Sequence, residues 1–132
     1  MHDVLIVEDE KPLRDKLTMN IDWKSQGYRI YEAGDGEEAL GILKQQEIDI
    51  LVTDIQMPKM NGIELVRRAK TIYPDLWVII ISGYGDWEYT QVLNMLGVDE
   101  YLLKPFRSQR LLDIVNNIRT ASLLKSSQQL SG

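Results

Sequence analysis

The sequence predicts an α/β fold: a doubly wound, five-stranded parallel sheet covered by helices on both faces. Five short apolar runs alternate with five longer segments in which apolar residues recur every three or four positions. The runs are too short for helices and rich in β-branched residues, which is typical of strands buried on both faces. Because the connections are short, each strand–helix–strand unit should form a right-handed crossover.

The first strand is expected at residues 4–7, and a helix follows it. Pro12 falls in the first turn of that helix, where a missing N–H removes no hydrogen bond. Leu13, Leu17 and Ile21 recur at four-residue spacing, so they should face the core.

The second strand is expected at residues 28–33 and the second helix directly after it. Asp35 and Glu38 have the spacing of a capping box, which predicts that the helix begins at Asp35. The apolar residues of this helix should be buried, and they are Ala39, Leu40 and Leu43.

The third strand, residues 50–53, ends on a carboxylate, Asp54. Asn61 and Glu64 repeat the capping-box spacing, and Pro74 ends the helix that they begin. The residues of this helix that are expected to point inward are Leu65, Val66, Ala69 and Ile72.

The fourth strand, residues 77–82, is the most apolar of the five. Asp86 should cap the helix that follows, and Gly97 should close it. The apolar face expected for this helix consists of Tyr89, Val92, Leu93 and Leu96. A fifth strand is expected at 100–104 and ends at Pro105.

Ser108 is expected to cap a last helix. Its apolar stripe consists of Leu111, Ile114, Val115 and Ile118. From about Ala121 the pattern thins into a segment rich in Ser, Gln and Leu. We therefore predict one domain over residues 1–120 and a linker or C-terminal tail over residues 121–132.

Composition excludes several classes of function. The 132 residues carry a net charge of −5, which argues against nucleic-acid binding by this domain alone. There is no cysteine and one histidine, so disulfides, thiolate metal sites and a histidine base are not expected. The sequence also has neither a signal-peptide pattern at its start nor an apolar stretch of about 20 residues, so we expect a cytoplasmic protein.

Four of the predicted strands end in residues suited to binding a ligand. Glu8 and Asp9 follow the first strand, and Asp54, Ser82 and Lys104 end the third, fourth and fifth. With the strand order 2-1-3-4-5, the first and third strands are neighbours at the topological switch point, so the three carboxylates should converge there. A divalent cation and Lys104 would balance their three negative charges, and Mg²⁺ suits carboxylate, water and phosphate oxygens.

These residue types together indicate phosphoryl transfer onto a carboxylate. Asp54 would attack phosphorus in line, while Mg²⁺ neutralises the phosphoryl oxygens. Lys104 would bind those oxygens, and Ser82 would donate a hydrogen bond to them. Each acid taken singly could be a solvated loop residue or a helix cap, but four strand ends together favour the site.

The chain resembles the receiver domains of two-component response regulators, with a flavodoxin-like fold. The resemblance covers residues 3–118, and the motifs that carry it are Glu8-Asp9, residues 54–62, Ser82-Gly83 and residues 101–106. It implies that a sensor histidine kinase phosphorylates Asp54. The domain would accept a phosphoryl group, and could lose it again, without being a classical enzyme.

The resemblance also assigns a role to each matching residue. It implies that Mg²⁺ is held by Glu8, Asp9, Asp54 and the backbone carbonyl of Gln56. Ser82 and Tyr101 would form the switch pair, and Lys104 would bind the phosphoryl group. The Lys104–Pro105 peptide is expected to be cis, as it often is in the family.

Phosphorylation would alter the face formed by the fourth helix, the fifth strand and the fifth helix. The Ser82 loop would move inward and Tyr101 would turn in after it, which biases a homodimer or an output contact. Residues 20–23 and 83–89 look like those of receivers joined to AraC-type helix-turn-helix domains. The chain would then be the N-terminal part of a transcription regulator, with DNA bound only through an output domain absent here. The alternative is a stand-alone receiver that acts by protein–protein contact.

Other interpretations of single motifs are weaker. Residues 34–39 match a dinucleotide fingerprint in form, but acidic residues crowd the helix start where a pyrophosphate would bind. A flavodoxin-type phosphate loop would fall on Glu8-Asp9-Glu10, which repels phosphate. A phosphatase with an aspartyl-phosphate intermediate would need an acid where Gln56 stands.

Two predictions concern the aromatic residues, one about packing and one about the lifetime of the phosphoryl group. Trp23, Trp77 and Trp87 are expected to be packing residues, although Trp87 lies beside the expected switch surface and could bind a partner there. Tyr84, two residues past Ser82, should hinder attacking water and so slow dephosphorylation.

Overall fold

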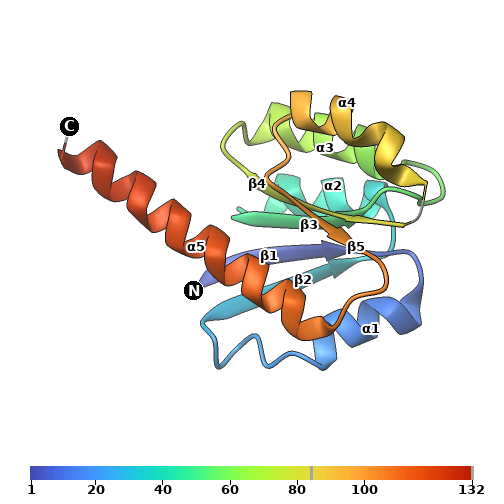
Figure 1. Ribbon diagram of the computed structural model, residues 1–132, viewed down its shortest axis with the longest axis horizontal. Helices are drawn as coiled ribbons and strands as arrows, with labels where there is room; N and C mark the ends of the chain where they lie inside the picture. Colours follow the sequence, from blue (N-terminus) through green and yellow to red (C-terminus); the bar gives the residue numbers. More distant parts are fainter. Residues whose placement is uncertain (84, 132) are drawn as a thin grey trace.

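The computed structural model describes residues 1–83 and 85–131, with side chains described as far as residue 125. Its parallel sheet has the predicted order β2-β1-β3-β4-β5 (Figure 1). The strands are β1 (His2–Val7), β2 (Tyr28–Ala33), β3 (Ile50–Asp54), β4 (Trp77–Ser82) and β5 (Glu100–Leu103). The helices are α1 (Lys11–Met19), α2 (Gly36–Gln45), α3 (Gly62–Ile72), the 3₁₀ helix η1 (Asp86–Tyr89), α4 (Thr90–Met95) and α5 (Ser108–Ser131).

The sheet separates two hydrophobic cores. Helices α2, α3 and α4 cover one face and α1 and α5 the other (Figure 1). Successive side chains of a strand point to opposite faces, so β1 sends Leu5 and Val7 into the first core and Val4 and Ile6 into the second. This is why the buried runs at residues 4–7, 50–52 and 78–81 are continuously apolar and show no alternation.

The strand pairing brings the carboxyl ends of the central strands to one edge of the sheet. Val7 pairs with Thr53, and Asp54 pairs with Ile81. Ser82 pairs with Leu103, the residue before Lys104. The residues that follow β1, β3, β4 and β5 therefore lie together.

Two of the predicted helix caps are confirmed. The side chains of Asp35 and Asn61 accept hydrogen bonds from the backbone N–H groups of Glu38 and Glu64 at 2.8 and 2.9 Å. The reciprocal half of each capping box is not formed. Glu38 accepts from Gly34 instead, and Glu64 pairs with the arginines that follow it in α3.

Some expectations for the first, third and fourth helices are wrong. Ile21 is buried in the core as expected, but helix α1 ends at Met19, so Ile21 lies beyond the helix. Ile72 and Val92 are expected to face the core, but both are exposed, at 36% and 47%. Asp86 does not cap α4, which begins only at Thr90 after the 3₁₀ turn.

Helix α5 begins at Ser108 itself and continues through the segment expected to be a linker or tail. Its residues pack against the sheet as far as Ile118, and the helix then runs on past the sheet to Ser131 (Figure 1). A domain boundary near residue 120 stays a prediction. Among the described residues, no helix is long and apolar enough to cross a membrane.

The close approach of α3 to the end of β3 depends on Gly62. Its N–H donates to the Ile55 carbonyl at 2.8 Å, and a Cβ at this position would overlap the Asp54 carbonyl oxygen. We expect Gly62→Ala to lower the free energy of unfolding by about 2 kcal/mol or more, because backbone must move to admit the methyl group. Urea denaturation of the two proteins measures this.

Gly41 in α2 offers a matched control. A Cβ there would meet no atom within 4 Å, and the position is inside a helix. Gly41→Ala should therefore stabilise the protein by up to about 1 kcal/mol. Equal effects of the two substitutions would contradict the packing argument for Gly62.

Candidate functional site

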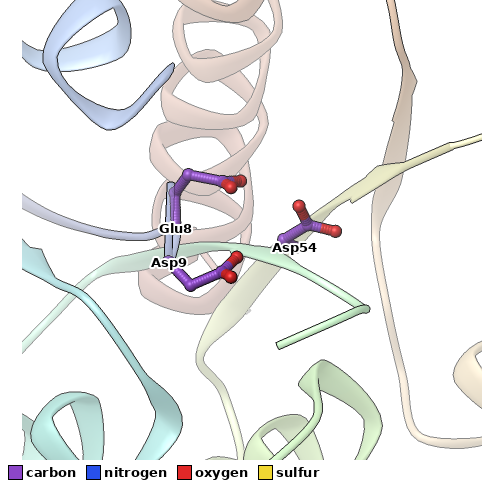
Figure 2. A group of neighbouring side chains, drawn as sticks. All are labelled: Glu8, Asp9 and Asp54. Atoms are coloured by element: carbon purple, nitrogen blue, oxygen red, sulfur yellow. The ribbon is translucent and has the colours of Figure 1, made fainter. Parts of the chain in front are cut away.

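Three carboxylates meet at the carboxyl end of the sheet. One oxygen from each of Glu8, Asp9 and Asp54 lies within 4.8 Å of the other two. Glu8 and Asp9 leave the end of β1 and extend toward Asp54 at the end of β3 (Figure 2). Glu8 and Asp54 are buried and Asp9 is exposed, so the cluster has one side open to solvent.

Lys104, the residue after β5, supplies the positive charge of the site. Its Nζ donates to Asp54 Oδ2 at 2.6 Å and lies 3.8 Å from Glu8 Oε2. Burial alone would lower the pKa of Lys104, but the hydrogen bond and the attraction of these carboxylates outweigh it and raise that pKa. Lys104 is therefore protonated at neutral pH. The peptide between Lys104 and Pro105 is cis, as expected.

Glu8 is the least well satisfied member of the cluster. Its side chain is fully buried, and among the described residues its Oε2 atom has no hydrogen-bond partner. Burial disfavours the carboxylate form, and the neighbouring Asp54 accepts a hydrogen bond from the protonated form and repels the ionised one. Together these effects raise the pKa of Glu8 to about 8.

The residues present fit a divalent cation. A buried oxygen without a partner is costly unless a proton or a positive ion satisfies it. Binding of such an ion would displace the proton of Glu8 and balance the negative charge that then exceeds the single charge of Lys104. Oxygen ligands of this type, with one side open to water, are those that Mg²⁺ prefers.

The raised pKa of Glu8 predicts a specific pH dependence for the metal-free protein. Between its unfolded value of 4.5 and its folded value of about 8, the folded state holds a proton that the unfolded state has lost. Stability must then fall as pH rises through this window. Glu8→Gln carries no such proton, so urea denaturation at several pH values between 5 and 8 should show a flatter profile for the variant. Parallel profiles would contradict the assignment.

Asp54 is held from the side of its own loop as well. The backbone N–H of Gln56 donates to Asp54 Oδ1 at 3.3 Å, while Lys104 holds Oδ2. A carboxylate oxygen fixed in this way can act as a nucleophile toward an electrophile, whose negative charge Lys104 and a bound metal ion would neutralise.

The two predicted switch residues lie on neighbouring, paired strands. Ser82 ends β4 and is buried beside the site. Tyr101 lies on β5, where it pairs with Ile80, and its hydroxyl reaches α4. That hydroxyl donates to Asn94 Oδ1 at 2.6 Å and lies 3.2 Å from the Thr90 carbonyl. The Tyr101 side chain is thus directed toward α4.

Sequence reasoning missed two side chains that hold residues of the site in place. Asp86, assigned as a helix cap, is instead buried and contacts the Gln56 side chain. Arg14 of α1 donates to the Glu8 carbonyl oxygen at 2.6 Å and so fixes the end of β1. No local pattern marks these contacts, because each joins segments that meet only in the fold. Tyr84 lies outside the described residues.

Two of the three tryptophans are packing residues as predicted, and the third is not. Trp23 is buried, and its indole N–H donates to the Leu17 carbonyl at 2.8 Å. Trp77 packs against the second core. Trp87 is 77% exposed, so the expectation that it is a packing residue is wrong.

Comparison with known proteins agrees with this geometry. The family model described as "Response regulator receiver domain" matches residues 4–116. The chain is 32% identical over 119 residues, 89% of its length, to the uncharacterized transcriptional regulatory protein YesN of Bacillus subtilis, and covers 32% of that protein. The chain spans between about a third and a half of the length of the curated relatives it matches.

Solved structures agree as well. The receiver (REC) domain of AraT, a response regulator from Geobacillus stearothermophilus, superposes with a TM-score of 0.86 at 36% identity, covering 95% of this chain and 98% of that one. A two component transcriptional regulator AraC from Clostridium phytofermentans gives 0.83 at 36% identity, with 97% and 99% covered. With the acidic cluster and the family match both in place, the chain belongs to the response regulator receiver domain family, whose members are signalling domains and not classical enzymes.

Proposed function

We propose that this chain is a phosphorylation-dependent receiver in which Asp54 accepts a phosphoryl group from a sensor histidine kinase. One observation carries the proposal: Asp54 is held between Lys104 and the acidic pair Glu8-Asp9 at the end of the sheet. A carboxylate oxygen of Asp54 attacks phosphorus, and the P–N bond of the kinase phosphohistidine breaks with its electron pair going to the ring nitrogen. The other ring nitrogen of the phosphohistidine already carries a proton, so the histidine leaves as neutral imidazole.

Each residue of the site has its own role in this transfer. Glu8, Asp9, Asp54 and the Gln56 carbonyl would hold Mg²⁺, which neutralises phosphoryl oxygens when bound. Lys104 already contacts Asp54, so after transfer its ammonium group can bind a phosphoryl oxygen. Ser82 lies at the end of the neighbouring strand and can donate a hydrogen bond to another.

Transfer then changes the surface on the far side of β5. Tyr101 is turned toward α4, where its hydroxyl donates to Asn94. When Ser82 moves to the phosphoryl group, Tyr101 can turn inward, which shifts the population between two packings. Exposed apolar side chains on η1, α4 and β5 could be covered by a partner or a second copy, namely Trp87, Val92, Met95 and Leu103.

The output is proposed to be transcription. The relatives YesN and AraC are named transcriptional regulators, and the chain spans a third of YesN. The chain would be the N-terminal part of such a regulator, and DNA would be bound by a further domain. The alternative, a receiver that acts by protein contact alone, predicts no helix-turn-helix sequence after Gly132 in the reading frame.

The experiment that tests this function is labelling by a small phosphodonor. Incubation with acetyl phosphate and Mg²⁺ should add one phosphoryl group per chain, detected as a mass increase of the intact protein. Chelation of the metal should prevent it. A chain that remains unlabelled with Mg²⁺ and an excess of donor, while correctly folded, would contradict the proposed function.

A further inference from the structure

Asp86 is a buried carboxylate that the proposed transfer does not use. It is 7% exposed and begins the 3₁₀ helix η1 without capping it. Its Oδ2 accepts from the Gly83 backbone N–H at 2.8 Å, and its Oδ1 accepts from the Gln56 side-chain amide at 3.2 Å. A buried carboxylate is costly unless it is hydrogen-bonded. Losing either donor would leave an oxygen of Asp86 unsatisfied, so both contacts stabilise this arrangement of the two loops.

These contacts join the two loops that flank Asp54. Gln56 lies on the loop after β3, and its backbone N–H donates to Asp54 Oδ1 at 3.3 Å. Gly83 lies on the loop after β4, directly after Ser82. A continuous chain of hydrogen bonds therefore runs from the Asp54 carboxylate through Gln56 and Asp86 to Gly83.

We propose that Asp86 is a positioning residue for phosphoryl transfer to Asp54, acting through the side-chain amide of Gln56. The contact fixes the part of the β3 loop whose N–H orients Asp54, and it fixes that part relative to the loop that begins at Ser82. Asp86 itself touches neither Asp54 nor the phosphoryl group. This inference rests on the proposed function, since it concerns the rate of the same transfer.

The donor and the acceptor of the hydrogen bond between Gln56 and Asp86 can be exchanged by substitution, and this exchange tests the proposal directly. In Gln56→Glu two carboxylates face each other, so the contact breaks. In the double variant Gln56→Glu/Asp86→Asn, the oxygen of the introduced asparagine can still accept from Gly83 while its amide donates to the introduced glutamate. The double variant thus restores the hydrogen bond in the opposite direction.

A second double variant separates the effect of the hydrogen bond from the effect of net charge. Gln56→Glu/Asp86→Ala has the same net charge as Gln56→Glu/Asp86→Asn but has no group that can donate to the introduced glutamate. Asp86→Asn alone should retain the contact, because the Gln56 amide can flip and accept from the amide of the introduced asparagine. It therefore serves as the conservative variant.

The measurement is the initial rate of phosphorylation by acetyl phosphate at saturating Mg²⁺, with near-ultraviolet circular dichroism to verify folding. We expect the rate to fall at least about threefold in Gln56→Glu and in Gln56→Glu/Asp86→Ala, as for other directly coupled pairs. It should return close to the wild-type rate in Gln56→Glu/Asp86→Asn. Asp86→Asn alone should stay within about twofold of wild type, since its contact persists.

Two outcomes overturn the inference. If both double variants recover equally, the charge balance and not the hydrogen bond is responsible. If all four variants transfer at the wild-type rate, Asp86 has only a structural role. Either outcome leaves the wild-type chain labelled, whereas failure of the proposed function would leave it unlabelled, so the two failures are distinguishable.

Discussion

Replacing Asp54 by asparagine is expected to abolish Mg²⁺-dependent phosphorylation of this chain. The substitution keeps the size of the side chain but removes the ionised oxygen that attacks phosphorus, and it takes one carboxylate from the cluster with Glu8 and Asp9. The measurement is the phosphoryl group incorporated per chain from acetyl phosphate, by intact mass. We expect less than about one hundredth of the wild-type labelling rate.

The same change elsewhere on the surface provides the control. Asp75 is exposed in the turn between α3 and β4, at the opposite end of the sheet. Asp75→Asn should be labelled at the wild-type rate. Stoichiometric labelling of Asp54→Asn would contradict the assignment of the phosphoacceptor.

Replacing Lys104 by methionine is expected to have two effects of opposite sign on the site. The ammonium group donates to Asp54 at 2.6 Å and lies 3.8 Å from Glu8, so its removal leaves the buried carboxylates without their cation. The metal-free protein should lose about 1–3 kcal/mol of stability, since Lys104 is partly exposed and solvent screens part of the loss. Mg²⁺ should bind about tenfold more tightly, because a competing positive charge is gone.

The phosphorylation rate separates these effects from simple damage. Without the group that binds phosphoryl oxygens, Lys104→Met should be labelled roughly a hundredfold more slowly even at saturating Mg²⁺. Lys11→Met is the matched control, since Lys11 forms an exposed pair with Asp15 at 2.8 Å. It should change stability by about 0.5 kcal/mol or less. Weaker Mg²⁺ binding in Lys104→Met would contradict the electrostatic account.

The fold and the carboxylate cluster could be predicted from the sequence because their signals are local. The apolar runs have the length of strands, and β2 and β4 have the predicted bounds. Asp35 and Asn61 begin their helices through contacts with residues three positions on. Strand ends in a parallel sheet share an edge, which is enough to bring Glu8, Asp9 and Asp54 together once the strand order is given.

Expectations failed where tertiary contacts decide the outcome. Helical periodicity shows which residues share a face, but not whether another element covers the edge of that face, so Ile72 and Val92 were misplaced. The Asp86 carboxylate had two acceptable partners: the start of its own helix, or Gln56, 30 residues away. Asp86 contacts Gln56 because the loops after β3 and β4 lie side by side in the fold, which no local pattern shows.

The length of α5 follows from the helix propensity of its C-terminal residues. Residues 121–131 contain neither glycine nor proline, and Ala, Leu, Lys and Gln favour helix. The apolar stripe ends near Ile118 because the sheet ends there. The amphipathic pattern therefore ends where α5 stops packing against the sheet, and the helix itself continues beyond that point.

The central claim, that Asp54 becomes an acyl phosphate, has a direct chemical test. Borohydride reduces an aspartyl phosphate to homoserine, and peptide mapping then gives the position of the modified residue. After incubation with acetyl phosphate and Mg²⁺, we expect homoserine at position 54 and at no other aspartate. Homoserine at another position, or an alkali-stable phosphate ester on a hydroxyl side chain such as Ser82, would contradict the account.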